Sequence, residues 1–200
     1  MDKLLLATEN KGKIREVEAL LRDLDIELIT PEMLQLRLEV EENGHTYAEN
    51  AASKALAYAQ SANLFSLADD SGLEVDALGG APGVHSHRFS PLPEATDADR
   101  RTYLLQKLGG HPRPWSARFH CTVALAAPNG NIRFTTGNCP GEIIPQERGQ
   151  NGFGYDPIFY LPEKGLTMAE LSMEEKNLLS HRARAVIAAR PLIKQYFGLS

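Results

Sequence analysis

Blocks of hydrophobic residues at the start of the chain predict a strand, a helix and a second strand, in that order. The apolar run Lys3–Thr8 is typical of a short buried strand. The next segment, Lys13–Asp23, spaces its apolar side chains three and four residues apart, as one face of a helix does. Ile26–Ile29 returns to the pattern of a strand, and a strand–helix–strand opening favours an α/β fold.

The middle of the chain continues this alternation of helix and strand signals. Thr46 precedes Glu49 by three residues, which is the spacing of a capping box, and an alanine-rich helix is predicted from there through about Ala59. We expect a strand over Leu64–Ala68 to end in the polar motif Asp69-Asp70-Ser71-Gly72. Polar residues at the end of a strand are candidates for a binding site.

A helix and a hairpin are predicted in the next part of the chain. The helix should run from Thr96 or Asp97 to about Leu108. Two strand patterns, Arg118–Ala127 and Asn131–Asn138, flank the turn signal Pro128-Asn129-Gly130, and Gly141–Pro145 could extend the same sheet.

The last part of the chain is predicted to be helical. Ser172 and Glu175 form a second capping box, and the helix is expected to continue to about Tyr196 with an interruption near Ser180. Pro191 should kink this helix or mark a break in it. Because no repeat or linker is seen, we expect residues 1–200 to form a single α/β domain with, at most, two lobes.

Composition adds limits on what the protein can be. The 200 residues are 42% hydrophobic and 24% charged, as in ordered globular proteins. A net charge of −5 argues against a general nucleic-acid binder, and no apolar run approaches the roughly 20 residues of a membrane helix. We therefore expect a cytoplasmic protein. Cys121 and Cys139 lie in no zinc-binding spacing and are expected to be inert thiols.

A polar turn after the first strand is a candidate phosphate site. Thr8-Glu-Asn-Lys-Gly-Lys13 precedes a helix, whose first backbone N–H groups attract anions. Thr8 and Asn10 add short polar side chains, and Lys13 adds a cation. The turn is neither a P-loop nor a GxGxxG motif, and a purely structural turn explains it equally well.

Acidic residues suggest a second kind of chemistry. Asp69 and Asp70 could hold Mg²⁺ or activate water, with a further carboxylate from Glu39, Glu41 or Glu42. An oxygen-only ligand set favours magnesium or manganese over zinc. The alternative is a turn in which an aspartate caps the next element.

Three other groups of residues carry weaker signals. Lys54 on the predicted second helix is, on base rates, an exposed helical lysine. The glycine-rich segment Phe153-Gly-Tyr-Asp156 could stack an aromatic ring on a base or simply form a turn. Lys176 and the run Ser180-His-Arg182 offer donors near a helix junction, where surface positions are the ordinary explanation.

Taken together, these motifs resemble the inosine/xanthosine triphosphate pyrophosphatase family. The resemblance covers nearly the whole chain, from about Leu4 to Ala188. It rests on six motifs in a fixed order: Thr8-x-Asn10-x-x-Lys13, Glu49-Asn50-Ala51 with Lys54, Ala68-Asp-Asp-Ser-Gly-Leu73, Leu78-Gly-Gly-Ala-Pro-Gly83, Gly152-Phe-Gly-Tyr-Asp-Pro157 and Ser180-His-Arg182.

The resemblance implies a homodimeric α/β enzyme. Its long central mixed β-sheet would be flanked by helices, with two lobes and the active-site cleft between them. The family hydrolyses ITP, dITP and XTP to the nucleoside monophosphate and pyrophosphate with Mg²⁺, which Mn²⁺ could replace. No nucleic acid or membrane is expected as a partner.

The resemblance also implies roles for particular residues. Glu42 and Asp70 correspond to acids of the metal site, and Asp70 also to the proton acceptor. Glu9 stands where the family has glycine and is not a phosphate ligand; His87 replaces a small residue. Phosphate contacts would come from Thr8, Asn10, Lys11, Gly12, Lys13 and Lys54, and other substrate contacts from Ser71, Phe153, Gly154, Tyr155, Asp156, Lys176, His181 and Arg182.

The residues suggest a division of labour within such a site. Lysines such as Lys13 and Lys54 suit phosphate, whereas Lys176 and Arg182 could donate to the 6-keto oxygen that distinguishes hypoxanthine from adenine. Two alternatives stay open. A Maf-like nucleotide pyrophosphatase would act on other bases, and a catalytically silent nucleotide-binding module would bind without turnover.

Overall fold

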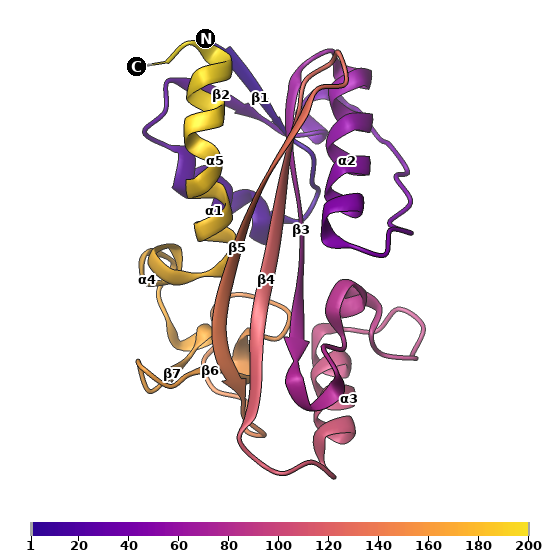
Figure 1. The fold of residues 1–200 in the computed structure, drawn as a ribbon, viewed down its shortest axis with the longest axis vertical. Helices are drawn as coiled ribbons and strands as arrows, with labels where there is room; N and C mark the ends of the chain where they lie inside the picture. Colours follow the sequence, from indigo (N-terminus) through magenta and orange to yellow (C-terminus); the bar gives the residue numbers. More distant parts are fainter. Residues whose placement is uncertain (1, 200) are drawn as a thin grey trace. The chain divides into compact units, whose positions relative to one another are not determined.

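One mixed sheet runs through the computed structural model, which describes residues 2–199 (Figure 1). Its strand order is β2-β1-β3-β4-β5-β6-β7. β1 is parallel to β2 and β3, whereas β6 is antiparallel to β5 and β7, so the predicted mixed α/β sheet is confirmed. The strands are β1 (Asp2–Leu6), β2 (Ile26–Ile29), β3 (Phe65–Val75), β4 (Trp115–Ala126), β5 (Ile132–Ile143), β6 (Phe159–Leu161) and β7 (Leu166–Thr167).

Helices connect the first four strands along the chain. The predicted capping boxes at Thr46 and Ser172 are both present, with each hydroxyl accepting from the backbone N–H three residues on. The predicted interruption at Ser180 is also confirmed, because it separates the last two helices. The helices are α1 (Lys11–Leu21), α2 (Tyr47–Ala62), α3 (Asp97–Leu108), α4 (Met173–Leu179) and α5 (His181–Phe197).

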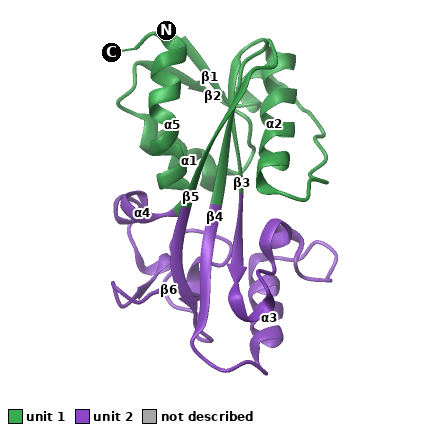
Figure 2. Cartoon of the chain, in the orientation of Figure 1, with its two compact units in different colours: residues 1–70, 121–137, 181–200 green, residues 71–120, 138–180 purple. Residues whose placement is uncertain are grey.

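The chain divides into two compact units, which Figure 2 shows in different colours. Unit 1 comprises residues 1–70, 121–137 and 181–200, and unit 2 comprises residues 71–120 and 138–180. β3, β4 and β5 each contribute residues to both units. The expectation of a single domain with a cleft between its lobes stays a prediction.

Unit 1 buries both faces of its part of the sheet. Leu4 and Leu6 of β1 pack with the apolar faces of α1 and α5, whereas Leu5 between them packs against α2. This alternation follows from the strand, since successive side chains point to opposite faces. Full burial of one such leucine contributes about 1.5–3 kcal/mol. The face of α2 that meets the sheet is mostly alanine, which allows a close approach.

Unit 2 has a hydrophobic core of its own. Leu73 and Val75 from the second half of β3 pack with Leu104 and Leu108 of α3. Phe159 of β6 is fully buried there, and its ring lies 4.3 Å from that of Phe119. Long stretches without regular structure, including residues 144–157, are therefore anchored on a continuous apolar cluster.

One expectation about secondary structure is wrong, and one of the two outcomes expected at Pro191 does not occur. β3 does not end at the motif Asp69–Gly72 but continues to Val75, because the alternation of buried side chains resumes at Leu73 in the core of unit 2. α5 does not break at Pro191. Both Pro191 and Ile187, whose carbonyl loses its N–H partner, lie on the exposed side, where water can donate instead.

In the described part of the chain, no helix has both the length and the apolar character that crossing a bilayer requires.

An ion pair at the surface of unit 1 ties α5 to α1 and should affect acid stability. Arg190 donates to both carboxylate oxygens of Asp23 and to the carbonyl of Leu20. The hydrogen bond from Arg190 is the main cause that lowers the pKa of Asp23 from 3.8 to about 2. A carboxylate with a lowered folded-state pKa stabilises the fold above its unfolded pKa, and this contribution is lost as the pH falls through the folded value.

We expect Asp23→Asn to lower Tm at neutral pH, and the difference from the unmodified protein to shrink between about pH 4 and pH 2. Thermal unfolding followed across this range measures the effect, with Asp25→Asn as a control for loss of an exposed acid on the same loop. A Tm difference that persists unchanged at pH 2 would contradict the assignment.

Candidate active site

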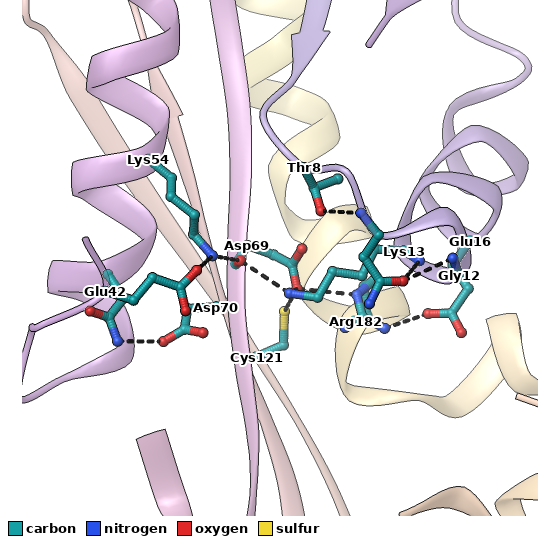
Figure 3. Close-up of polar contacts among 12 residues, drawn as sticks. Thr8, Gly12, Lys13, Glu16, Glu42, Lys54, Asp69, Asp70, Cys121 and Arg182 are labelled. Carbon is teal, nitrogen blue, oxygen red and sulfur yellow. Dashed lines mark hydrogen bonds and ion pairs between the residues drawn. The ribbon is translucent and has the colours of Figure 1, made fainter. Parts of the chain in front are cut away.

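Two neighbouring aspartates of β3 point to opposite faces of the sheet. Asp69 follows Phe65 and Leu67 in alternation and so faces α1 and α5, whereas Asp70 follows Ala68 and faces α2. Figure 3 shows the side chain of each with its own set of partners. The motif that the sequence presents as a pair of acids is thus divided between two environments.

Asp69 is the centre of a buried charge cluster. Arg182 Nε donates to Asp69 Oδ2 at 3.2 Å, and Arg182 Nη1 donates to Glu16 Oε2 at 2.5 Å. Lys13 Nζ lies 3.0 Å from the same Asp69 oxygen. Burial lowers the pKa of Arg182, but the charges of Asp69 and Glu16 outweigh it and raise the pKa above its ordinary value. The guanidinium therefore stays charged although Arg182 is only 2% exposed.

Asp70 lies among residues of α2 and the segment that precedes it. Asn50 Nδ2 donates to Asp70 Oδ2 at 2.9 Å, and Asn50 Oδ1 in turn accepts from the backbone N–H of Gly44. Burial raises the pKa of Asp70 above its usual range, although the charge of Lys54 and the bond from Asn50 act against this. Asp70 is thus a more basic carboxylate than an exposed aspartate.

Lys54 joins the environments of the two aspartates. Its Nζ donates to the main-chain carbonyl of Asp69 at 3.0 Å and pairs with Glu42 Oε1 at 2.8 Å. Burial lowers the pKa of Lys54, but the charges of Asp69, Glu42 and Asp70 raise it further, so the ammonium is retained. Lys13 Nζ donates to the same carbonyl at 3.3 Å. Two lysines from different helices therefore meet at one peptide group of β3.

In the polar turn before α1, the side chain of Asn10 caps the N-terminus of that helix. Asn10 Oδ1 accepts from the N–H groups of Gly12 and Lys13, at 2.9 and 3.1 Å, and Thr8 Oγ1 accepts from the N–H of Asn10. Two of the amides expected to meet phosphate are therefore occupied by Asn10. The positive charge at this end of unit 1 comes chiefly from side chains, namely Lys11, Lys13 and Lys54.

The carboxylates next to Lys54 suit one kind of metal binding. Among residues 2–199, no three His, Cys, Asp or Glu side chains are grouped so that they could hold a metal by themselves. Mg²⁺ commonly binds through one or two carboxylates, with phosphate and water oxygens as its other ligands. Glu42 and Asp70 fit this mode, because both lie beside Lys54 in unit 1 (Figure 3).

Of the three glutamates considered from the sequence, Glu42 has the best position. It is the one that pairs with Lys54. Glu41 instead accepts from the side chain of Asn43, and Glu39 lines a cavity of about 740 Å³ together with Thr8 and Leu36.

In unit 2 the structure brings together three of the predicted substrate residues. Lys176 Nζ donates to Asp156 Oδ2 at 2.6 Å and lies 5.0 Å from the centre of the Phe153 ring. Asp156 Oδ2 also accepts from the backbone N–H of Phe153, and Tyr155 donates its hydroxyl to the carbonyl of Ser86. Phe153, Asp156 and Lys176 thus form one compact cluster. Ser71 belongs to the same unit, in β3.

Arg182 and His181 have different surroundings from those expected. Both are buried in unit 1, at the start of α5, and the guanidinium of Arg182 contacts two carboxylates. Lys176, with which Arg182 was grouped as a base contact, belongs to unit 2. The prediction that Arg182 contacts the base stays a prediction.

Sequence reasoning missed Glu16 and the separate role of Asp69. Glu16 lies four residues before Leu20 and next to Val17, on the buried side of α1. An acid within an apolar helical stripe is a signal that it has a buried cationic partner. The sequence does not indicate that this partner lies 166 residues away, in Arg182.

Comparisons with known proteins show the family of the chain. The model of the Ham1 family matches residues 4–192. The chain belongs to the Ham1 family. It is 46% identical over 196 residues to a dITP/XTP pyrophosphatase of Desulforamulus reducens, covering 98% of this chain and 97% of that one. It is 49% identical over 187 residues to a dITP/XTP pyrophosphatase of Listeria monocytogenes, covering 93% and 92%.

Solved structures of the Ham1 family share the fold. A HAM1 protein from Coxiella burnetii superposes with a TM-score of 0.88 at 41% identity, covering 98% of this chain and all of that one. The Ham1 protein of Staphylococcus aureus gives 0.84 at 37% identity with the same coverage. Both likenesses extend over the whole sheet, so the predicted fold class is confirmed.

The buried cluster around Asp69 in this Ham1-family chain should dominate the stability of unit 1. We expect Arg182→Met to lower the free energy of unfolding by about 3–5 kcal/mol, because the buried carboxylates of Asp69 and Glu16 lose their shared cation. Urea unfolding measures the loss. Arg22→Met, at an exposed position of unit 1, should change stability by less than about 0.5 kcal/mol. Equal losses in the two variants would show that the buried ion pairs of Arg182 do not stabilise unit 1.

Proposed function

We propose that this chain is a Mg²⁺-dependent nucleoside triphosphate pyrophosphatase that hydrolyses the non-standard purine nucleotides ITP, dITP and XTP to the monophosphate and pyrophosphate. One observation carries the proposal: two carboxylates and two lysines meet around Asp69–Asp70 of β3, in a chain nearly half identical to dITP/XTP pyrophosphatases along its length. The reaction needs a base, a metal site and cations for the leaving group, and this set of residues can supply all three.

The lysines bind the phosphates. Lys13 and Lys54 each place an ammonium group on the Asp69 carbonyl, and both side chains are largely buried. An ammonium donates three hydrogen bonds, so each retains donor capacity toward an anion. A lysine presents a compact charge that does not depend on the base, and this pair therefore favours triphosphates as a class.

Asp70 accepts the proton of the attacking water. Burial raises the pKa of this carboxyl, so that its affinity for a proton is greater than that of an exposed aspartate. Asn50 holds one oxygen of Asp70 and fixes its orientation. Water activated here attacks the α-phosphorus, and pyrophosphate leaves toward the lysines.

Glu42 and Asp70 would hold the metal ion. When bound there together with the substrate, Mg²⁺ neutralises phosphate charge and orients the reacting oxygens. Lys54 keeps Glu42 in place through its ion pair. A side chain that is 39% exposed, as that of Glu42 is, can move to meet an incoming metal–nucleotide complex.

The base is recognised by the cluster in unit 2. Phe153 offers an aromatic face for stacking, and Lys176 beside it offers donors to the 6-keto oxygen of hypoxanthine or xanthine. Adenine presents an amino group there, so a buried donor would face another donor, at a cost of about 1–3 kcal/mol. Asp156 fixes the orientation of Lys176 through its ion pair with the ammonium group.

We also propose that the protein is a homodimer in the cytoplasm that acts on free nucleotides, without nucleic acid or membrane partners. A catalytically silent module is disfavoured, because Glu42 and Asp70 are both present and both lie by Lys54. A Maf-like specificity is disfavoured by the match of the Ham1 family to residues 4–192.

Pyrophosphate release from ITP, XTP, GTP, dTTP and ATP tests the proposed function. We expect ITP and XTP to be preferred, and Asp70→Asn to lower kcat by about 10²–10⁴-fold, since loss of a general base has this effect. Far-ultraviolet circular dichroism confirms that the variant is folded. A preference for dTTP would favour the Maf-like alternative, and an Asp70→Asn variant with more than about a tenth of the activity would remove Asp70 from the mechanism.

Metal dependence tests the roles of the two carboxylates. We expect excess EDTA to abolish activity and Mg²⁺ to restore it. Glu42→Gln should raise the Mg²⁺ concentration needed for half-maximal rate, because a neutral amide binds a hard cation less well than a carboxylate. Glu41→Gln is the matched control and should leave the titration unchanged. If Glu41→Gln shifts the titration and Glu42→Gln does not, the ligand assignment is wrong.

A further inference from the structure

The loop Gly152–Asp156, which carries the stacking residue Phe153, has little intrinsic rigidity. Gly152 and Gly154 adopt positive φ angles of 76° and 62°, a region open to glycine at low cost. Asp156 fixes the start of the loop by accepting from the N–H of Phe153. A glycine on each side of Phe153 gives the backbone that carries its ring a wide range of conformations, which contacts from elsewhere in the chain must restrict.

Two residues of α3 hold that backbone at Gly154. Asp97 Oδ2 accepts from the N–H of Gly154 at 2.7 Å, and Arg101 Nη1 donates to the carbonyl of Gly154 at 2.8 Å. The N–H belongs to the peptide unit before Gly154 and the carbonyl to the unit after it. Both torsion angles of this flexible residue are therefore fixed from one helix.

Asp97 and Arg101 are themselves well anchored. The second oxygen of Asp97 accepts from Arg100, a buried residue whose guanidinium also donates to the carbonyls of His87 and Ala95. Burial raises the pKa of Asp97, but the bonds from Arg100 and Gly154 outweigh it and lower the pKa below its ordinary value.

Arg101 is held by Glu147, to which it donates two parallel hydrogen bonds at 2.8 and 2.9 Å. Only 12% of its side chain is exposed. Arg101 uses its remaining nitrogen for Gly154, a division of donors that the fork of a guanidinium allows and a lysine ammonium does not reproduce.

We propose that Asp97 and Arg101 are positioning residues for base recognition: by bonding the peptide units on both sides of Gly154, they hold Phe153 in the orientation that stacks on the purine. This inference rests on the function proposed above and deepens it. We call these two contacts of Asp97 and Arg101 with Gly154 the clamp. A preorganised ring loses little conformational entropy on binding, so the clamp raises the affinity of the enzyme for the base. The phosphate end of the substrate, bound by Lys13 and Lys54, does not depend on it.

The test compares Arg101→Met with Arg101→Lys and with Glu147→Gln. We expect Arg101→Met to raise KM for ITP about five- to tenfold, the effect of one lost charge-assisted hydrogen bond, with kcat changed less than about twofold. Arg101→Lys should recover part of this affinity. The inhibition constant of inorganic pyrophosphate should stay the same in all variants. Glu147→Gln, which weakens the anchor of Arg101 but leaves Gly154 bonded, should raise KM clearly less than Arg101→Met does.

Several results would overturn the proposal. A parallel rise in the inhibition constant of pyrophosphate would indicate general damage, and an unchanged KM would show that the loop keeps its form without Arg101. An equal effect of Glu147→Gln would assign the change to the ion pair instead. If Arg101→Met does not fold, Arg101→Lys alone decides between these outcomes.

Amide hydrogen exchange separates this inference from the proposed function. Exchange across residues 151–156 should be faster in Arg101→Met than in the unmodified protein, whatever substrate the enzyme uses. If the unmodified protein hydrolyses none of the triphosphates but the loop is loosened as expected, the function fails and the clamp stands. If hydrolysis is found and exchange is unchanged, the clamp fails and the function stands.

Discussion

The alternation of side chains along β3 at Asp69 and Asp70 is the constraint on which the rest of the site depends. Two adjacent carboxylates cannot share an environment on an extended strand, because the pleat sends them to opposite faces. The face of α1 and α5 neutralises Asp69 with Arg182 and Lys13. The face of α2 leaves Asp70 with a raised pKa. One acid is thereby made structural and the other is available for chemistry.

Neutralising Asp69 also positions the cations of the site. Removing an unpaired carboxylate from water costs several kcal/mol, and the buried guanidinium of Arg182 offsets this cost while satisfying Glu16 as well. With Asp69 fixed, its carbonyl receives Lys13 from α1 and Lys54 from α2. The two ammonium groups therefore have positions set by the main chain of the central sheet, which is the least mobile part of a protein.

Much of the fold could be predicted from local signals, and the failures have physical causes. Capping boxes at Thr46 and Ser172 and the turn before Gly130 depend on a few neighbouring residues, and all three form as expected. The continuation of β3 through Asp69 depends on a second core beyond the motif, which no local pattern reveals.

The site was harder to predict than the fold because the residues that interact in it lie far apart in the sequence. Lys13, Lys54 and Asp70 were named from motifs, and Glu42 was one of three candidate glutamates; the structure brings the four residues together. The burial of Arg182 was not foreseen, since an arginine beside a histidine at a helix start is usually on the surface. The contacts of Asp97 and Arg101 with Gly154 span more than fifty residues, and nothing near either residue indicates them.

The division of unit 1 among three stretches of chain has a consequence for synthesis on the ribosome. Domains commonly fold from the N-terminal side as the chain emerges, but Asp69 is made 113 residues before Arg182. Until that arginine leaves the exit tunnel, the nascent chain carries Asp69 and Glu16 without the guanidinium that contacts both of them, and Lys13 alone can pair with Asp69. The core of unit 1 is therefore completed only after residues 181–199 have been made, and unit 2, whose last residue is Ser180, can be complete before unit 1.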